Sequence, residues 1–143
     1  TYRGGKAVRG APPNFATFKV GDSSKTPAQI LAHIGDLFDW AVQLAKGVHE
    51  WEDSVPLEWE REIARFHISI ENFDDYLKST APLDTSAAKL FQGPVADALT
   101  HVGQLAMLRR LAGMPMKSEN YFEAEIVTGR VGPRQTPPRK EFD

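Results

Sequence analysis

The stretch that decides the fold is PVADALTHVGQLAMLRRLA, residues 94–112. Pro94 is favoured in the first turn of a helix and Gly113 suits the left-handed position just past a helix end, so one helix is predicted between them. At about 100° per residue, one stripe of this helix carries Asp97, His101, Leu105, Leu108 and Ala112. A second apolar stripe lies on the far side and carries Val95, Leu99, Val102 and Ala106. The pattern predicts a helix that is buried on two faces.

An acid and an imidazole therefore stand where core residues are expected. Asp97 and His101 are one helical turn apart, so their polar atoms can converge on one point. A buried carboxylate without a partner costs several kcal/mol, and a divalent metal ion is a partner that fits. The alternative is that Asp97 and His101 simply hydrogen-bond to each other.

A third ligand is expected from an earlier helix. Residues 27–48 predict an amphipathic helix, because apolar residues recur at alternating spacings of four and three: Ile30, Ile34, Leu37, Ala41, Leu44 and Val48. His33 lies on the flank of this stripe and can point into a bundle interior or along its edge. Two imidazoles and one carboxylate from two facing helices leave coordination positions open, as catalytic metals require. The alternative is that His33 is a half-buried surface histidine.

Two motifs resemble the metal-ligand helices of the DinB-like family, the damage-inducible and YfiT-like four-helix bundles. Residues 26–36, TPAQILAHIGD, resemble the first ligand helix, and residues 96–113, ADALTHVGQLAMLRRLAG, resemble the second. The resemblance covers about residues 26–129.

In that family a histidine of an early helix joins a His-x-x-x-His pair on a later helix, and x-Gly-Gln follows the last histidine. His33 matches the first ligand, and His101, which precedes Val102-Gly103-Gln104, matches the last. Asp97 stands where the family usually has a histidine. Relatives in the mycothiol-dependent maleylpyruvate isomerase branch carry an acid there.

The resemblance implies an all-α, DinB-like four-helix bundle with a metal site of His33, Asp97 and His101 between its helices. It implies a divalent-metal-dependent enzyme with hydrolase or thiol-transfer chemistry, a small-molecule substrate, a thiol cosubstrate in the second case, and pairing as a homodimer. The donor set suits Zn, Ni, Fe or Mn. The alternative is a non-catalytic helical domain that binds metal or a small ligand or mediates dimerisation, because no general base beyond the ligands is evident.

Three further residues are candidates for the outer shell of the site or for its pocket. Asp36 lies one turn after His33 and can orient that imidazole or a metal-bound water; the alternative is a plain solvated acid. Gln104 lies one turn after His101 and offers a polar group near the site; the alternative is a hydrogen bond between helices. His67 forms an i,i+4 pair with Glu71 on the middle helix, where a hydrogen bond at the solvent edge is the favoured reading.

Composition bounds the class of protein. The chain has 143 residues, 41% hydrophobic and 25% charged, as in an ordinary globular domain. A net charge of −2 gives no electrostatic case for nucleic acid or an anionic membrane. There is no cysteine, so thiolate ligands and disulfides are excluded. No apolar run reaches the roughly 18 residues of a membrane span, no signal peptide is visible, and a cytoplasmic location is expected. The first residue is Thr1, so a truncated N-terminus is expected.

The chain is predicted to form one domain, residues 1–143. Residues 1–26 are rich in glycine and proline and are predicted to be a mostly irregular lead-in. The helical core is expected over residues 27–129, with a middle helix at 57–79, the helix from Pro94, and a short last helix at 118–128. The proline-containing tail, residues 130–143, is predicted to be extended.

Overall fold

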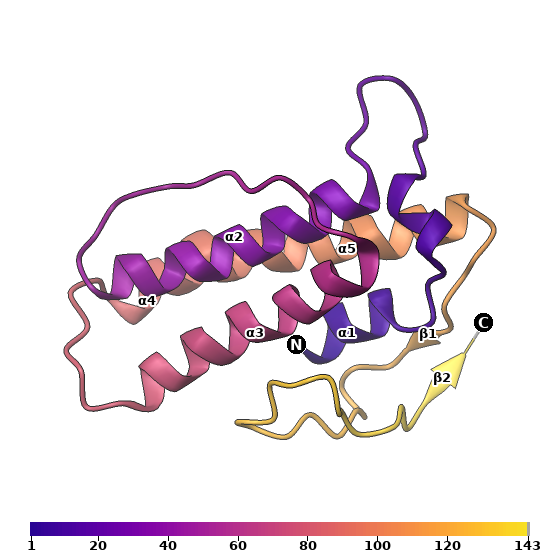
Figure 1. Cartoon of the computed structure of the whole chain (residues 1–143). Helices are drawn as coiled ribbons and strands as arrows, with labels where there is room; N and C mark the ends of the chain where they lie inside the picture. Colours follow the sequence, from indigo (N-terminus) through magenta and orange to yellow (C-terminus); the bar gives the residue numbers. More distant parts are fainter. Residues whose placement is uncertain (143) are drawn as a thin grey trace.

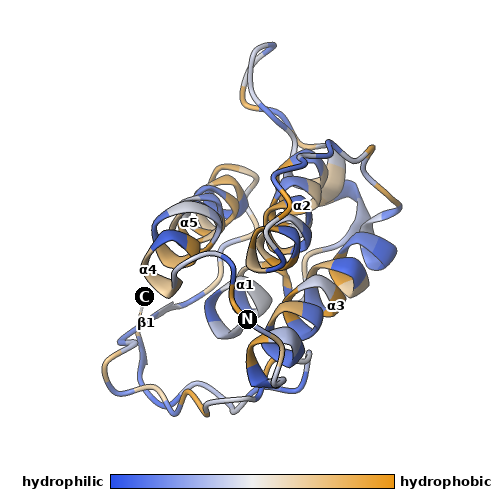
Figure 2. Cartoon of the chain, turned by 90° about the vertical axis from the view of Figure 1, so that its left-hand side faces the viewer, coloured by the Kyte–Doolittle hydropathy of each residue, from blue (hydrophilic) through white to orange (hydrophobic). Residues whose placement is uncertain are grey.

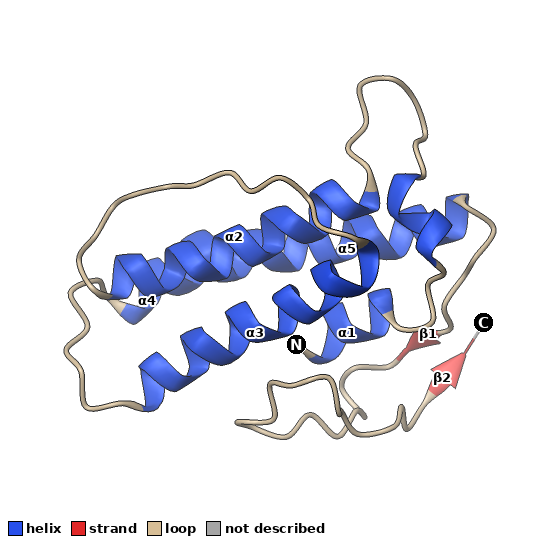
Figure 3. Ribbon diagram, viewed as in Figure 1, coloured by secondary structure: helices blue, strands red, loops and turns tan. Residues whose placement is uncertain are grey.

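The computed structural model describes residues 1–142, and most of its regular structure is helical (Figures 1 and 3). The prediction of an all-α class is confirmed at this level. No helix of the described part is both long and apolar enough to cross a membrane. In chain order the elements are α1 (Tyr2–Val8), the 3-10 helix η1 (Pro13–Thr17), α2 (Pro27–Ala45), α3 (Trp59–Lys78), α4 (Ala87–Leu90), the π-helical turn η2 (Phe91–Val95), α5 (Ala96–Leu111), β1 (Ser118–Glu119) and β2 (Glu141–Phe142).

The start of α2 follows from a capping box. The Thr26 hydroxyl accepts the backbone N–H of Gln29 at 3.3 Å, and the Gln29 side chain accepts the backbone N–H of Thr26 at 2.9 Å. Pro27 occupies the first helical position, where its missing N–H costs nothing. The helix ends at Ala45, three residues before the predicted end, and Gly47 then adopts a φ of +79°. The middle helix, α3, starts and ends within two residues of its predicted limits.

The sequence predicts that the helix carrying Asp97 and His101 begins at Pro94, but helical backbone begins earlier in the chain. Helical backbone begins at Ala87, after a cap in which the Ser86 hydroxyl accepts the N–H of Lys89. Pro94 lies inside the π turn η2, which joins α4 to α5. Proline has no N–H to donate and its ring crowds the preceding turn, so a wider turn accommodates it within a continuing helix.

The lead-in is less irregular than predicted. Residues 2–8 form α1, and this short helix packs against α3 and α5. Its glycines serve close packing rather than a loop: a Cβ at Gly4 would lie 2.6 Å from the Phe66 ring, and one at Gly5 would lie 3.5 Å from His67. The prediction that Gly4 and Gly5 lie in an irregular segment is therefore wrong, because both belong to α1.

The core lies between α2 and its neighbours. Helix α2 contacts α3 along one side and α5 along the other, and α1 lies between α3 and α5 (Figure 2). Fully buried side chains come from these helices and from η1: Val8, Phe15, Leu31, Ile34, Phe66 and Leu105. The prediction that α5 is buried on two faces is only partly right. Leu105 and Leu108 are buried, whereas Leu99, Met107 and Leu111 are about half exposed.

The region after α5 contains no helix within residues 112–142, so the predicted last helix at 118–128 is wrong. Ser118 pairs instead with Phe142, and Glu119 with Glu141, in a short antiparallel ladder (Figure 3). The tail from residue 130 has no helix, as predicted. The buried carboxylate of Glu119 accepts hydrogen bonds from Tyr2 Oη at 2.6 Å and from Lys6 Nζ at 2.7 Å, so β1 is fastened to α1.

Candidate metal centre

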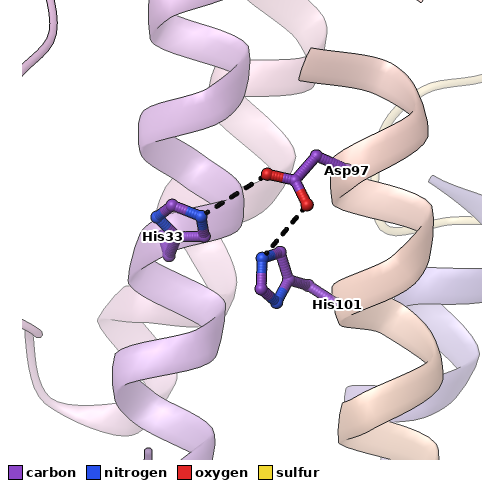
Figure 4. A group of neighbouring side chains, drawn as sticks. All are labelled: His33, Asp97 and His101. Atoms are coloured by element: carbon purple, nitrogen blue, oxygen red, sulfur yellow. Dashed lines mark ion pairs between the residues drawn. The ribbon is translucent and has the colours of Figure 1, made fainter. Parts of the chain in front are cut away.

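Three side chains that the sequence singles out face one another across two helices. His33 projects from α2, and Asp97 and His101 project from α5 (Figure 4). His33 Nε2 lies 3.8 Å from Asp97 Oδ2, and His101 Nε2 lies 3.4 Å from Asp97 Oδ1. The two imidazole rings are 4.7 Å apart between centroids and nearly perpendicular. One potential ligand atom from each residue lies within 4.8 Å of the other two.

These spacings suit ligands arranged around a small cation. Nitrogen and oxygen ligands bound at about 2.0–2.2 Å in tetrahedral geometry lie roughly 3.3–3.6 Å from one another. The two distances from Asp97 are 3.4 and 3.8 Å, and among the described residues no hydrogen bond joins the three side chains directly. Asp97 Oδ1 and His101 Nε2, at 3.4 Å, form an ion pair when the ring is protonated, so the direct interaction of these two side chains stands beside the metal reading. The donor set and its spacing fit a divalent ion.

Gln104 orients one of the imidazoles. Its side-chain oxygen Oε1 lies 3.0 Å from Nδ1 of His101. An amide oxygen can only accept, so with this oxygen facing the ring a neutral His101 carries its proton on Nδ1. Nε2, which faces Asp97, then carries the lone pair that a metal needs. This position agrees with the outer-shell role suggested for Gln104.

His33 is held in an environment that favours the neutral ring. Burial, followed by the neighbouring His101 and Lys25, lowers the pKa of His33 below its ordinary value, and these effects outweigh the attraction of Asp97 and Asp36. A neutral imidazole is the form that binds metal. Trp51, from the loop between α2 and α3, packs edge-to-face on His33 with ring centroids 5.4 Å apart.

The carboxylate is more exposed than the sequence predicts. The Asp97 side chain is 49% exposed, against 20% for His33 and 14% for His101. The argument that a buried, uncompensated carboxylate requires a partner is therefore wrong for Asp97. The remaining argument for a metal site is that the donor atoms of His33, Asp97 and His101 converge. The exposure of Asp97 also leaves one side of the group open to water.

Asp36 lies near His33 but has other partners. Arg65 of α3 forms an ion pair with Asp36, and the backbone N–H of Ser54 donates to its other oxygen at 3.1 Å. Burial alone would raise the pKa of Asp36, but these hydrogen bonds outweigh it and hold the pKa below its ordinary value. Carboxylate oxygens of Asp36 and Asp53 and a ring nitrogen of His33 also lie within 4.8 Å of one another. Because Asp36 is already committed to Arg65, this second group is the poorer cation site.

His67 is a candidate that the structure does not bring to the site. It is buried in α3 against Gly5 of α1, rather than at the solvent edge. Burial lowers its pKa, and the carbonyl of Val131 only partly opposes that effect. It does not belong to the group formed by His33, Asp97 and His101. Its position serves the packing of α1 and the tail on α3.

A groove runs along α5 beside one of the three donors, His101. It has a volume of about 630 Å³ and is lined by Ser24, Lys25, Ile30, Thr100, His101, Gly103, Gln104, Met107 and Leu108. A small molecule in it would contact His101 directly. The only charged side chain in this lining is Lys25, a cation.

Sequence reasoning does not identify the neighbours that come from loops and from α3. Trp51 and Asp53 belong to a segment without periodicity, and Arg65 carries no motif. A weak signal is present in Trp51 and the acids around it, which stand in a long segment between two predicted helices. Comparison of the chain with protein-family models, with curated proteins and with solved structures gives no match.

Proposed function

We propose that the protein is a DinB-like, divalent-metal-dependent enzyme whose metal is held by His33, Asp97 and His101. The observation that carries the proposal is the convergence of the three donor atoms within 4.8 Å, from the two helices that the motifs mark. The x-Gly-Gln signature adds support, because Gln104 bonds the far nitrogen of His101. Zn, Ni, Fe and Mn all suit this donor set.

Each side chain of the site has a separate role in the proposed chemistry. The two histidines offer lone pairs from two different helices, and Asp97 offers charge from the exposed side. A divalent ion held there supplies Lewis acidity, which lowers the pKa of a coordinated water or thiol in hydrolase or thiol-transfer chemistry. The groove along α5 admits a small-molecule substrate or a thiol cosubstrate beside His101. Asp53, close to His33 and without an ion pair among the described residues, is the carboxylate best placed to accept a proton.

Exchange of Asp97 for histidine tests whether the carboxylate is a ligand. If Asp97 binds metal, Asp97→His retains binding because it restores a three-histidine set, whereas Asp97→Ala loses it. A ligand that binds only the native state stabilises it by about 2.7 kcal/mol at a concentration one hundred times its Kd, so melting temperatures with metal and with EDTA report occupancy. Elemental analysis of untagged protein, purified without added metal, gives the native occupant.

Asp75→Ala, at an exposed position of α3, is the matched control and should behave as wild type. Equal melting temperatures for loaded and stripped wild type would contradict the metal site and the enzyme with it. What would then remain is the second function, a non-catalytic helical domain.

We propose pairing with a second copy through the outer face of α5. Leu99 and Leu111 are about half exposed, and they lie on the sides of α5 away from the buried Leu105. A helix with apolar residues on both sides is usually buried on both. Sedimentation should give twice the 15.9 kDa chain mass, and Leu111→Glu should give the single mass. Phe122→Glu, on the exposed part of the C-terminal region, should leave the mass doubled. A single mass for wild type would refute the pairing and leave the metal proposal intact.

A further inference from the structure

A long loop contacts one ligand of the proposed metal centre, His33. Residues 46–58 join α2 to α3 without helix or strand and run back along α2 (Figure 1). Connections of more than about 12 residues without secondary structure are uncommon in compact domains and are usually functional. This loop brings Trp51 and Asp53 next to His33.

The loop is fastened at its far end by two buried carboxylates. The backbone N–H of Ser54 donates to Asp36 at 3.1 Å, and the backbone N–H of Leu57 donates to Glu62 at 2.7 Å. Both acceptors are buried, and both are close to the guanidinium of Arg65. These bonds fix the backbone of the loop shortly after Trp51.

The imidazole of His33 lies between two aromatic neighbours. Trp51 packs on it at 5.4 Å between centroids with an interplanar angle of 65°, and His101 packs on it at 4.7 Å and 87°. Trp51 is itself supported by Trp40, at 5.6 Å and 89°. A histidine on the flank of a helix otherwise rotates among several side-chain conformers. In this packed conformer Nε2 of His33 lies 3.8 Å from Asp97 Oδ2.

We propose that Trp51 is a positioning residue, which holds the ring of His33 in its ligating orientation. The proposal rests on the metal site described above and extends it to the loop. Trp51 reduces the conformational freedom that His33 would lose when a metal binds, so it strengthens binding without being a ligand. Loss of Trp51 should therefore weaken metal binding while all three ligands remain.

The test compares Trp51→Ala, Trp51→Phe and a control in the same loop, Val55→Ala, whose side chain is 84% exposed. Outer-shell partners of metal ligands are typically worth about 10–100-fold in affinity. We expect Trp51→Ala to raise the Kd for Co²⁺ about tenfold, to speed release of Co²⁺ to EDTA, and to alter the absorption bands of the bound ion. Trp51→Phe, which keeps an aromatic edge on His33, should restore all three readouts. Val55→Ala should match wild type.

Two further measurements separate positioning from stability. The melting temperature of the metal-free protein should be nearly the same for Trp51→Ala, Val55→Ala and wild type, because Trp51 is 40% exposed and lies outside the core. Ni²⁺ should quench tryptophan fluorescence strongly in wild type and much less in Trp51→Phe at full occupancy. Of the three tryptophans, Trp51 is the one in contact with a proposed ligand.

The outcomes are distinguishable. If wild type binds no metal, the proposed function fails and the role of Trp51 fails with it. If wild type binds metal and Trp51→Ala matches it in affinity, release rate and Co²⁺ spectrum, the metal site stands and the positioning role is refuted. If Trp51→Ala does not fold, a Trp51→Phe protein whose Ni²⁺ quenching equals that of wild type would equally refute it.

Discussion

Replacement of His101 by alanine is expected to reduce the metal content of the purified protein to background. His101 Nε2 is one of three donors, and a site left with one imidazole and one half-exposed carboxylate holds a divalent ion weakly. The loss of a ligand should exceed the roughly 100-fold that outer-shell changes produce in affinity. Elemental analysis and a chelator competition assay measure the effect.

His33→Ala should have the same consequence from the opposite helix, and the pair of variants makes the test specific. His49→Ala is the matched control, because His49 is an exposed histidine outside the group of converging donors. Full metal occupancy in both His33→Ala and His101→Ala would show that the ligand set is wrong.

Loss of the Glu119 carboxylate is expected to cause the largest change in stability. Its side chain is fully buried and accepts from Tyr2 Oη and Lys6 Nζ, while Glu141, the second partner of Lys6, is partly exposed. Removal of one member of a buried ion pair costs about 3–5 kcal/mol, because the other charge stays buried. Glu119→Ala should therefore lower the free energy of unfolding by about 3 kcal/mol, which corresponds to roughly 10 °C in melting temperature.

A surface ion pair in the same region provides the control. Glu125 pairs with Arg139, and both side chains are about half exposed or more, so Glu125→Ala should change stability by less than about 1 kcal/mol. Equal melting temperatures for Glu119→Ala and Glu125→Ala would refute the stabilising role of the buried Glu119 carboxylate.

Alkaline titration of Tyr2 tests the same hydrogen bond to Glu119 in a second way. Burial, followed by the hydrogen bond to Glu119, raises the pKa of Tyr2 to about 12. The group is therefore protonated in the fold beyond the pH at which a free tyrosine ionises. Its contribution to stability is complete below about pH 10 and is lost as the pH rises toward 12. In Glu119→Gln the phenolate absorbance of Tyr2 should appear at lower pH.

The sequence is most informative where one local rule decides the structure. Thr26, Pro27 and Gln29 mark the start of α2 unambiguously, and the spacing of Asp97 and His101 places both on one side of a helix. The fold is harder to predict where tertiary contacts decide. Gly4 and Gly5 look like a loop because their purpose, the close approach of α1 to α3, depends on Phe66 and His67 more than sixty positions away.

The candidate site also has a part that the sequence predicts and a part that depends on tertiary contacts. The ligand positions follow from helical period, but the exposure of Asp97 depends on how α5 is rotated against α2, which no local pattern specifies. The burial of His67 likewise depends on α1 and the tail, which pack over it. Trp51 reaches His33 only because Asp36 and Glu62 hold the backbone of a loop with no period of its own.

The π turn at Phe91–Val95 sets the rotational phase of everything that follows it. A π turn accommodates about one residue more than an α turn, and one residue is worth about 100° of rotation. Leu90, before the turn, is buried against Ala41 and Phe73, and Leu105, after it, is buried in the main core. Side chains on both ends of this helical stretch are therefore buried. The bearing of Asp97 and His101 toward α2 therefore depends on the wide turn: if the same residues formed a regular α turn, everything after it would be rotated by about 100° relative to α4, although every donor remained in the chain.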